Sequence, residues 1–312
     1  MTPNVLLGDP SFFRIKSGGN PHTRDRLGRR KRVDLRAAIE QWNRLKRALE
    51  EQGARVHLLP ADPELPGMVF PANAGFRFGD QFYLSNLNPA RASEKEHYRR
   101  TISGLGLKVR DLPAPHRFEG EADFIPVGHP SGDPAGTVYL FTYGQIEEPR
   151  WVLRSGFPPY RRVYGFRSDV RILPALKASV HPREVMLLEL ADESHYHGDT
   201  VLCTFGPHRE YVMAYLEGLL PESVRALQAR FKDRLLAVSR EDGRHFAANS
   251  FQLFTGSSGR RVPVLLMPDG LGLDLYSQVR QRGVVPFPVD VSEFLEKGGG
   301  AVKCMLLDLG CF

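Results

Sequence analysis

The chain contains Phe70-Pro71-Ala72-Asn73-Ala74-Gly75-Phe76 and, further along, a near repeat of it, Phe246-Ala247-Ala248-Asn249-Ser250-Phe251. Each segment places an asparagine, Asn73 or Asn249, just ahead of two apolar runs with turn residues between them, which is the pattern of a β-hairpin. Comparable polar residues precede other such segments at a period of about 50 residues, which is typical of a fold built from repeated units. The residues that mark this period are Asn20, Asn73, Asp123, Asp199, Asn249 and Cys304.

Each hairpin is followed by a helical pattern, one or two glycines and a short apolar strand. In the first unit, Asp34 is suited to cap a helix that begins at Leu35, and Gly53 ends this helix ahead of a strand at 55–60. Since six polar residues bound only five intervals, we expect the last strand, at Cys304, to pair with the first unit. The sequence therefore predicts an α/β fold with five hairpin–helix–strand units in a ring, forming one domain over 1–312 with leading residues that point toward one axis.

The one long interval of this period contains a stretch rich in Pro and Gly at about 128–160, which we interpret as a surface insertion or flap. Composition agrees with a globular protein, since 42% of the 312 residues are apolar and 25% are charged. No apolar run approaches the roughly 20 residues of a membrane helix, and no export signal opens the chain. Cys203, Cys304 and Cys311 are odd in number and widely spaced, which suits a reducing cytoplasm without a disulfide scaffold.

The formal net charge is +6, and much of the excess lies in one short basic loop over 24–32. A basic run of this kind is found in arms that bind nucleic acid. No aromatic residues are interleaved with it here, and no helix-turn-helix or zinc-finger spacing follows. We therefore interpret it as a solvated loop and do not expect nucleic acid as a partner. The basic residues of the loop are Arg24, Arg26, Arg29, Arg30, Lys31 and Arg32.

Three of the segments that lead the units carry reactive side chains, at 118–123, 196–200 and 298–304. Cys304 follows three glycines, which leave its backbone free to approach a ligand and its thiol accessible. A histidine brought near it, such as His197, would hold the thiolate or donate a proton to a leaving group. The pattern indicates nucleophilic catalysis by a cysteine.

Carboxylates occur in the same segments. Asp123 and Asp199, with Glu119 or Glu121, would bind a planar cation, and the fork of donors on a guanidinium matches carboxylate oxygens in pairs. The sequence therefore predicts attack by a thiolate on the carbon of a bound guanidinium.

Other interpretations remain open at this point. On a strand, His195, His197 and Asp199 would share one face and form a half-site for zinc or iron, as in a metal-dependent hydrolase. Cys304 would alternatively be an inert cysteine in an apolar strand over 302–307. A third alternative is a binding protein that keeps the ring without catalysis and contacts RNA through the basic loop.

Taken together, the motifs resemble those of the pentein-fold enzymes that modify guanidino groups. These are the dimethylarginine dimethylaminohydrolases, the arginine deiminases and dihydrolases, and the amidinotransferases. The resemblance implies the pentein fold, a five-fold pseudo-symmetric α/β propeller, and runs over nearly the whole chain. It rests on 65–75 (LPGMVFPANAG), 118–123 (FEGEAD), 164–169 (YGFRSD), 196–200 (YHGDT) and 298–304 (GGGAVKC).

The resemblance also implies roles for the candidate site residues. Cys304 would be the nucleophile that forms a covalent amidino-thioether, and His197 would protonate the departing amine and then activate water. Asp199, in the catalytic set, and Asp123 would bind the guanidinium. Neither a metal nor a cofactor is expected. The remaining substrate-binding candidates are Glu121, Asn73, Asn20, Arg91, Arg167 and Gly298, of which the two arginines would hold a substrate carboxylate or shape the site.

Arg171 stands near the position where some relatives place a carboxylate that supports the histidine, and three further departures from the family pattern affect the pocket. Gly67 stands where relatives usually carry Asp, Glu121 where they carry a second glycine, and Gly198 where they carry a larger apolar residue, so each would alter the shape or charge of the pocket. The basic loop would be a lid or a rim that attracts carboxylates.

The expected function is cysteine-dependent hydrolysis of the guanidino group of free or methylated arginine in the cytoplasm. Transfer of the amidino group to an amine is the close alternative. We expect a small guanidino compound as the partner and no membrane contact, with a homodimer left open.

Overall fold

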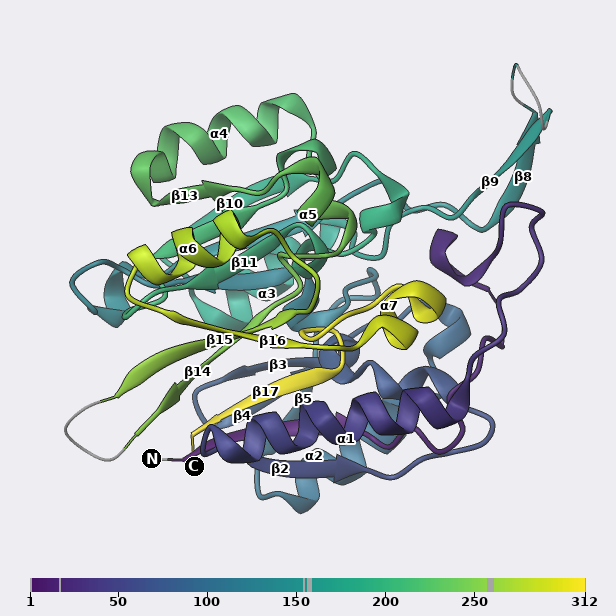
Figure 1. The fold of residues 1–312 in the computed structure, drawn as a ribbon, viewed down its shortest axis with the longest axis horizontal. Helices are drawn as coiled ribbons and strands as arrows, with labels where there is room; N and C mark the ends of the chain where they lie inside the picture. The colour runs from purple at the N-terminus through teal and green to yellow at the C-terminus, as the bar shows by residue number, and fades with distance from the viewer. Residues whose placement is uncertain (1, 17, 154, 156–158, 257–260, 312) are drawn as a thin grey trace.

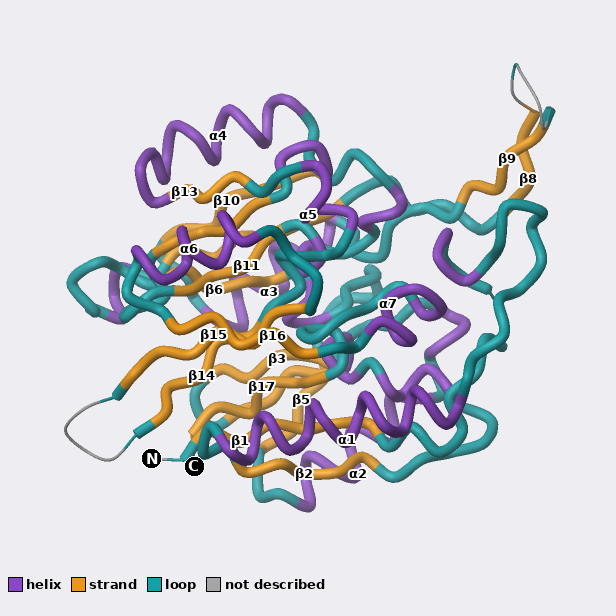
Figure 2. Tube along the Cα trace, in the orientation of Figure 1, coloured by secondary structure: helices purple, strands orange, loops and turns teal. Residues whose placement is uncertain are grey.

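The strands form five three-stranded sheets and one separate two-stranded hairpin in the computed structural model, which describes residues 2–16, 18–153, 155, 159–256 and 261–311 (Figure 1, Figure 2). In each three-stranded sheet, one outer strand pairs antiparallel with the central strand, and the other outer strand pairs parallel with it. The sheets are β17 (Leu306–Cys311), β1 (Pro3–Gly8) and β2 (Arg55–Leu59); β3 (Gly75–Phe78), β4 (Gln81–Leu84) and β5 (Lys108–Asp111); β6 (Phe124–Val127), β7 (Val138–Tyr143) and β10 (Glu184–Glu189); β11 (Leu202–Phe205), β12 (Tyr211–Ala214) and β13 (Leu235–Ala237); and β14 (Phe251–Thr255), β15 (Val262–Pro268) and β16 (Val285–Val289).

A helix connects the central strand of each sheet to its parallel neighbour, because parallel strands need a crossover connection. Two shorter helices, α5 and α7, precede β14 and β17. The crossover helices are α1 (Leu35–Glu51), α2 (Glu94–Gly104), α3 (Leu173–Val180), α4 (Pro221–Phe231) and α6 (Leu273–Gln281), and the shorter ones are α5 (Arg240–Arg244) and α7 (Ser292–Gly298). The predicted order of hairpin, helix and strand is thereby confirmed.

Helix α1 illustrates how the sequence determines these elements. The carboxylate of Asp34 accepts hydrogen bonds from the first backbone N–H groups of the helix, as its predicted role as N-cap requires. Trp42, Leu45 and Leu49 recur at helical spacing and are buried. Replacing Leu45 by alanine would cost about 2–5 kcal/mol of stability, the usual range for a fully buried leucine.

The last strand completes the first sheet. β17 pairs antiparallel with β1, so that Leu306 lies opposite Leu7 and Cys311 lies opposite Pro3, and this confirms the predicted pairing of the last strand with the first unit. Asn20 was wrongly included among the residues that precede strands, because it caps a short turn at Pro21–Thr23 in the loop between β1 and α1. The first sheet takes its leading strand from the end of the chain.

The predicted insertion at 128–160 is wrong in part. Val138–Tyr143 is β7, the centre of a sheet, and its Pro- and Gly-rich flanks hid it in the sequence. The projecting part is the hairpin of β8 (Arg150–Leu153) and β9 (Tyr160–Val163), which stands away from the sheets near the loop that follows β1 (Figure 1). Residues 154 and 156–158 of the predicted insertion lie outside the described residues.

Buried apolar clusters cross from one unit to the next. Leu45 of α1 and Phe294 of α7 belong to one cluster with residues of β15, and Met213 of β12 and Leu265 of β15 belong to another. Among the described helices, none combines the length and the apolar character that crossing a bilayer requires.

Candidate active site

The residues that mark the period of the sequence come together in the structure. Asn73, Asp123, Asp199, Asn249 and Cys304 lie one to three residues ahead of β3, β6, β11, β14 and β17, so each sheet supplies one of them. All five are buried. Hydrogen bonds join Asp123, Asp199, Asn249 and Cys304 to one another or to the segment 197–198, and Nδ2 of Asn73 lies 3.3 Å from the ring of His197. The repeated units thus place one polar side chain each at a common site.

Cys304 lies in a turn before β17, and Asn249 holds that turn in place. Oδ1 of Asn249 accepts hydrogen bonds from the backbone N–H groups of Ala301 and Cys304, at 3.0 and 3.1 Å. Nδ2 of Asn249 donates to Sγ of Cys304 at 3.1 Å and to the carbonyl of Asp199 at 3.0 Å. The position of the sulfur is therefore fixed by an amide from a different sheet.

The thiol is buried rather than accessible, since Cys304 is only 4% exposed. The glycines before it serve close packing instead: a Cβ at Gly300 would lie 2.8 Å from the ring of Phe70 and 2.9 Å from Cβ of Cys304. Oδ2 of Asp199 lies 3.4 Å from Sγ. Burial and the Asp199 carboxylate raise the pKa of Cys304 well above its ordinary value, against the smaller effect of Asn249. The free site therefore holds a neutral thiol at neutral pH.

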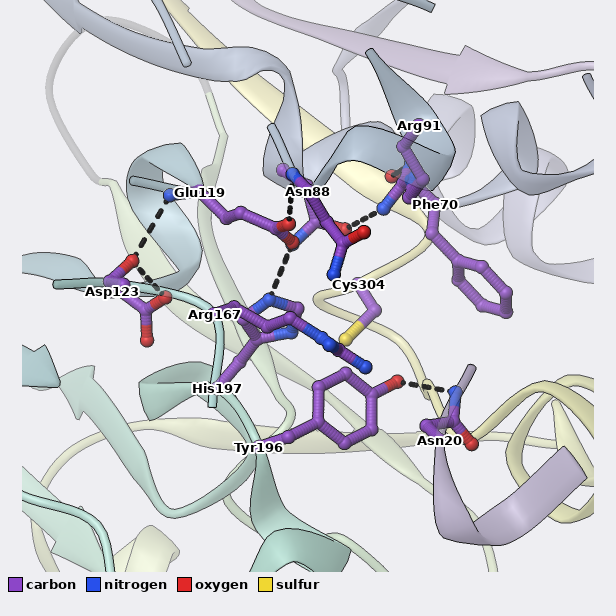
Figure 3. A network of polar contacts seen from close by, with 12 residues as sticks. Asn20, Phe70, Asn88, Arg91, Glu119, Asp123, Arg167, Tyr196, His197 and Cys304 are labelled. Carbon is purple, nitrogen blue, oxygen red and sulfur yellow. Dashed lines mark hydrogen bonds and ion pairs between the residues drawn. The ribbon is translucent and has the colours of Figure 1, made fainter. Parts of the chain in front are cut away.

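His197 is paired with Glu119, which the sequence suggested only as an alternative to Glu121. Nε2 of His197 donates to Oε2 of Glu119 at 2.8 Å, and Oε1 of Glu119 accepts from the backbone N–H of Asn88 (Figure 3). Burial lowers the pKa of His197, but the hydrogen bond that it donates to Glu119 and the charge of Asp123 outweigh this effect, and the net shift is upward. The pair therefore favours the protonated, cationic form of the imidazole.

Asp123 lies behind this histidine. Its carboxylate accepts hydrogen bonds from Oγ1 of Thr142 at 2.7 Å, from the backbone N–H of Gly198 at 2.8 Å and from Oγ of Ser168 at 2.6 Å. Since both oxygens already have protein donors, the geometry favours a role in fixing the chain next to His197. Binding of a guanidinium by Asp123 stays a prediction.

Glu121 is not among the groups around the thiol. Its carboxylate pairs with Nζ of Lys303 at 2.5 Å and accepts the backbone N–H of Asp308 at 2.9 Å. The residue follows the same turn as Glu119, but its side chain forms a separate ion pair.

The two candidate arginines differ in how much of their donor capacity is used. Arg91 donates to both oxygens of Glu94, to Oδ1 of Asn73 and to the carbonyls of Gly67 and Phe70. Nδ2 of Asn73 lies 3.3 Å from Nε2 of His197, so Arg91 reaches the histidine through this amide. The geometry makes Arg91 a residue that shapes the site.

Arg167 lies over the ring of Tyr196, with its guanidinium carbon 5.2 Å from the ring centroid, and donates to the carbonyl of Gly19. Asn20 donates to Oη of Tyr196 at 3.1 Å and to the carbonyl of Gly298 at 2.8 Å. Figure 3 shows Arg167, Tyr196, His197 and Cys304 gathered in one region, with Asn20 at its edge. The loop after β1 therefore reaches the site.

The metal alternative is wrong, because its ligand set is not formed. The segment that contains His195, His197 and Asp199 consists of short turns rather than a strand. The ring of His195 packs against Tyr215 and Phe246, with burial lowering its pKa to about 4, while His197 binds Glu119. Among the residues that the structure describes, no three His, Cys, Asp or Glu side chains are arranged to hold a metal ion.

Two of the three departures from the family pattern have packing explanations. A Cβ at Gly198 would lie 2.1 Å from Oγ1 of Thr142, so this glycine permits close packing and does not widen a pocket. A Cβ at Gly67 would lie 2.8 Å from Oε1 of Glu94, the carboxylate that binds Arg91. The third, Glu121, is explained by its ion pair with Lys303.

Several residues of the site were not predicted. Asn249 was identified as part of the period, and the shared phase with Cys304 was the signal that it belonged in the site. Tyr196 lies beside the predicted histidine, with ring centroids 4.7 Å apart, and donates to the carbonyl of Gly299. Ser168 bridges Asp123 and the backbone N–H of Glu119; it lies in the 164–169 motif that carries the resemblance, but it was given no role in the site.

Comparison with known proteins identifies the relatives of this chain. No family model matches it. The N(G),N(G)-dimethylarginine dimethylaminohydrolase of Mycobacterium tuberculosis is 29% identical over 309 residues, which cover 99% of this chain and 86% of that protein. The bifunctional arginine dihydrolase/ornithine cyclodeaminase AgrE of a Nostoc species is 29% identical over 272 residues, covering 86% of this chain and 33% of AgrE. The chain thus spans about a third of that bifunctional relative.

Solved structures agree in fold. The N-terminal domain of ArgZ, a cyanobacterial arginine dihydrolase captured as a Cys-to-Ser mutant with its substrate, matches with a TM-score of 0.79 and 24% identity, covering 99% of this chain and 98% of that one. A dimethylarginine dimethylaminohydrolase, as the adduct of a His-to-Gly variant with S-methyl-L-thiocitrulline, matches with a TM-score of 0.67 and 18% identity, covering 99% and 100%. The chain is therefore a homologue of dimethylarginine dimethylaminohydrolase and of the arginine dihydrolases, with the mixed α/β fold of the pentein enzymes that modify guanidino groups.

Proposed function

We propose that this chain is a cysteine-dependent hydrolase of the guanidino group of arginine or of a methylated arginine. The observation that carries the proposal is the set of groups around one buried thiol. Asp199 lies 3.4 Å from Sγ of Cys304, and His197, two residues before Asp199, is hydrogen-bonded to Glu119. The names of the relatives support this assignment, since they act on arginine or on dimethylarginine.

In the first step, a guanidinium binds against Asp199 and Glu119 and brings a positive charge next to the thiol. A nearby cation lowers a thiol pKa, so the bound substrate reverses the upward shift that burial and Asp199 impose on Cys304. The thiol releases its proton to solvent as the substrate binds, and the thiolate forms a C–S bond with the guanidinium carbon. His197 donates its proton to the departing nitrogen as the C–N bond breaks, which leaves an amidino-thioether on Cys304.

In the second step, His197 removes a proton from water, and the resulting hydroxide attacks the same carbon. The C–S bond breaks and the sulfur is released as thiolate, which takes up the proton that the added hydroxyl loses as the ureido carbonyl forms. The products are a ureido compound and an amine or ammonia. Glu119 supports both steps, because it stabilises the protonated imidazole that acts as the acid in the first step and re-forms in the second.

The other candidate residues position the substrate. We assign the substrate carboxylate to Arg167, since Arg91 already donates to Glu94, Asn73 and two carbonyls. Asn20 and Gly298 form the edge of the site near Tyr196. The basic loop follows Asn20 directly in the chain, so it is suited to attract an anionic carboxylate to this edge.

The ring arrangement belongs to this proposal as well. Five sheets of the same pairing pattern, each with one leading residue at the site, support a five-fold pseudo-symmetric pentein propeller that forms one catalytic domain over 1–312. In this arrangement, each repeated unit contributes one polar residue to the same buried site.

A panel of guanidino compounds tests the function. The protein is incubated with arginine, monomethylarginine and asymmetric dimethylarginine, and citrulline, ornithine, ammonia and methylamines are measured. We expect turnover of at least one compound, with loss of that turnover in Cys304→Ser. Cys311→Ser is the matched control, because this cysteine is exposed and is the last residue of β17. Full turnover in Cys304→Ser would contradict the proposal.

The same assay separates hydrolysis from amidino transfer. Glycine, ornithine or lysine is added as an acceptor amine, and new guanidino products are measured. Hydrolysis predicts ureido product or ornithine at an unchanged rate, whereas stoichiometric formation of a new guanidino compound would identify a transferase.

A further inference from the structure

A second group of buried charges lies directly beside the nucleophile in the chain. Lys303, the residue before Cys304, places Nζ 2.5 Å from Oε1 of Glu121, and their side chains are only 14% and 12% exposed. Oε1 of Glu121 also accepts the backbone N–H of Asp308, whose own carboxylate lies 3.6 Å from Nη1 of Arg209. The ion pair is therefore largely shielded from solvent but not fully buried.

Asp199 connects this ion pair to the thiol. Glu121, Lys303 and Asp199 line one cavity of about 80 Å³, and Asp199 also lies 3.4 Å from Sγ of Cys304. A cavity of this volume is large enough for water, but its walls keep the charges poorly screened compared with the surface. A change in the charge of the pair is therefore felt at the thiol and at Asp199.

Stability does not explain why the pair is buried. Two charges removed from water lose hydration energy that their mutual attraction only partly restores, and well-packed apolar residues of the same volume are often as stable. Burial raises the pKa of Glu121 to about 7 in spite of Lys303, and the charge of Asp308 adds to this shift. A costly pair next to a nucleophile points to a role in its chemistry.

We propose that the Lys303–Glu121 ion pair sets the acidity of the Cys304 thiol, with Lys303 favouring the thiolate and Glu121 limiting that effect. Both are positioning residues, since they act through Asp199 and Cys304. The inference rests on the proposed function, in which Cys304 must ionise before it attacks.

Other titratable groups also lie near Cys304 and Glu121, and none of them is mutated in the test. Asp199 and Tyr196 act on Cys304 together with Lys303. Asp308 acts on Glu121 together with Lys303. Because these groups are common to all variants, a difference between variants reports on the ion pair.

The test measures the rate at which iodoacetamide alkylates Cys304 as a function of pH. Peptide mass spectrometry separates this site from Cys203 and Cys311. In Glu121→Gln the charge of Lys303 is no longer offset, so the pH midpoint of alkylation moves down. In Lys303→Met the cation is lost, so the midpoint moves up. Each shift is expected to be about one pH unit, the lower end of the effect of a neighbouring charge.

Two further variants keep the test decisive. Lys303→Arg retains the charge and is expected to keep the wild-type midpoint, and the double variant Glu121→Gln/Lys303→Met is expected to lie between the two single variants. Equal midpoints in all folded variants, or shifts of both single variants in the same direction, would overturn the proposal. Alkylation needs no guanidino turnover, so a protein inactive on the whole substrate panel would still show these shifts if the ion pair acts as proposed.

Discussion

Glu119 and Glu121 are two residues apart, yet they occupy opposite electrostatic environments. The Glu119 carboxylate accepts hydrogen bonds from His197 and from the backbone N–H of Asn88. Burial raises the pKa of Glu119, but His197 and the charges of Arg91 and Arg167 lower it more, so the pKa lies below its ordinary value. For Glu121 burial prevails, and its pKa rises to about 7. The number of cations around a buried carboxylate, rather than its depth, decides which protonation state it keeps.

The residue between them makes this divergence possible. Gly120 has a φ of +66°, and a Cβ there would lie 2.4 Å from the carbonyl oxygen of Gly75. Only glycine adopts this conformation freely at such a close approach. The turn therefore presents one glutamate to the histidine and the other to Lys303.

Removing the imidazole of His197, to which Glu119 is hydrogen-bonded, is expected to have the largest effect on activity. His197→Asn is expected to lower kcat by roughly 10²- to 10⁴-fold, because proton transfer to the departing nitrogen and from water is lost. Steady-state kinetics on the preferred guanidino substrate measures this effect. His195→Asn is the control, since His195 packs against Tyr215 and Phe246. Equal losses in both folded variants would contradict the assignment.

Glu119→Gln weakens the same machinery without removing the imidazole. We expect kcat/KM to fall roughly 10- to 100-fold, the value of a hydrogen bond to a charged group. Glu119 raises the pKa of His197, so its loss lowers that pKa. Since His197 must be protonated to act as the acid, the alkaline limb of the profile of kcat/KM against pH moves to lower pH. An unmoved limb would show that the pair does not set the protonation of His197.

A smaller effect, on stability, is expected from a change near Arg91, whose charge also acts on Glu119. Gly67→Asp would place a second carboxylate against Glu94, whose Oε1 lies 2.8 Å from the position of the new Cβ. We expect a loss of about 1–3 kcal/mol in the free energy of unfolding, from crowding and like charge. Adding Glu94→Ala to Gly67→Asp frees the space and leaves one carboxylate for Arg91. If denaturant unfolding showed that the two substitutions lower the unfolding free energy additively, the new aspartate would not be replacing Glu94 as the partner of Arg91.

The last effect concerns the pH dependence of stability on the Glu121 side. The pKa of Glu121 is raised from an ordinary 4.5 to about 7 in the folded chain, so its contribution to stability is fully present below 4.5 and is lost as pH rises through about 7. One such proton changes the unfolding free energy by at most about 1.4 kcal/mol per pH unit. Glu121→Gln is therefore expected to lose less stability than the wild type between pH 5 and pH 8. Parallel curves from urea unfolding would contradict this shift.

Much of the fold was predictable because it repeats. Helix α1 with its Asp34 cap, and the pairing of β17 with β1, followed from periodicity and from counting the units. Strand β7 was missed because Pro and Gly flank it, and Asn20 was placed before a strand because its type and spacing matched the other leading residues.

The site was predictable as a set of residues but not as a set of contacts. Cys304, His197 and Asp199 were identified from their types and their shared phase, and the structure brings their segments together. The choice between Glu119 and Glu121 depends on which way a left-handed glycine turns the chain, and this direction has no signature in a single sequence. The close packing of Gly198 on Thr142 likewise depends on a neighbour from another strand.

Covalent trapping on Cys304 tests the central claim most directly. His197→Gly is incubated with S-methyl-L-thiocitrulline, whose methanethiol group leaves without a proton from histidine, so the adduct forms while its hydrolysis is blocked. Intact-protein mass spectrometry followed by peptide mapping is expected to find one stoichiometric adduct, located on Cys304 and absent from Cys304→Ser. A protein that stays unmodified, or an adduct carried by Cys203 or Cys311 instead, would contradict the account.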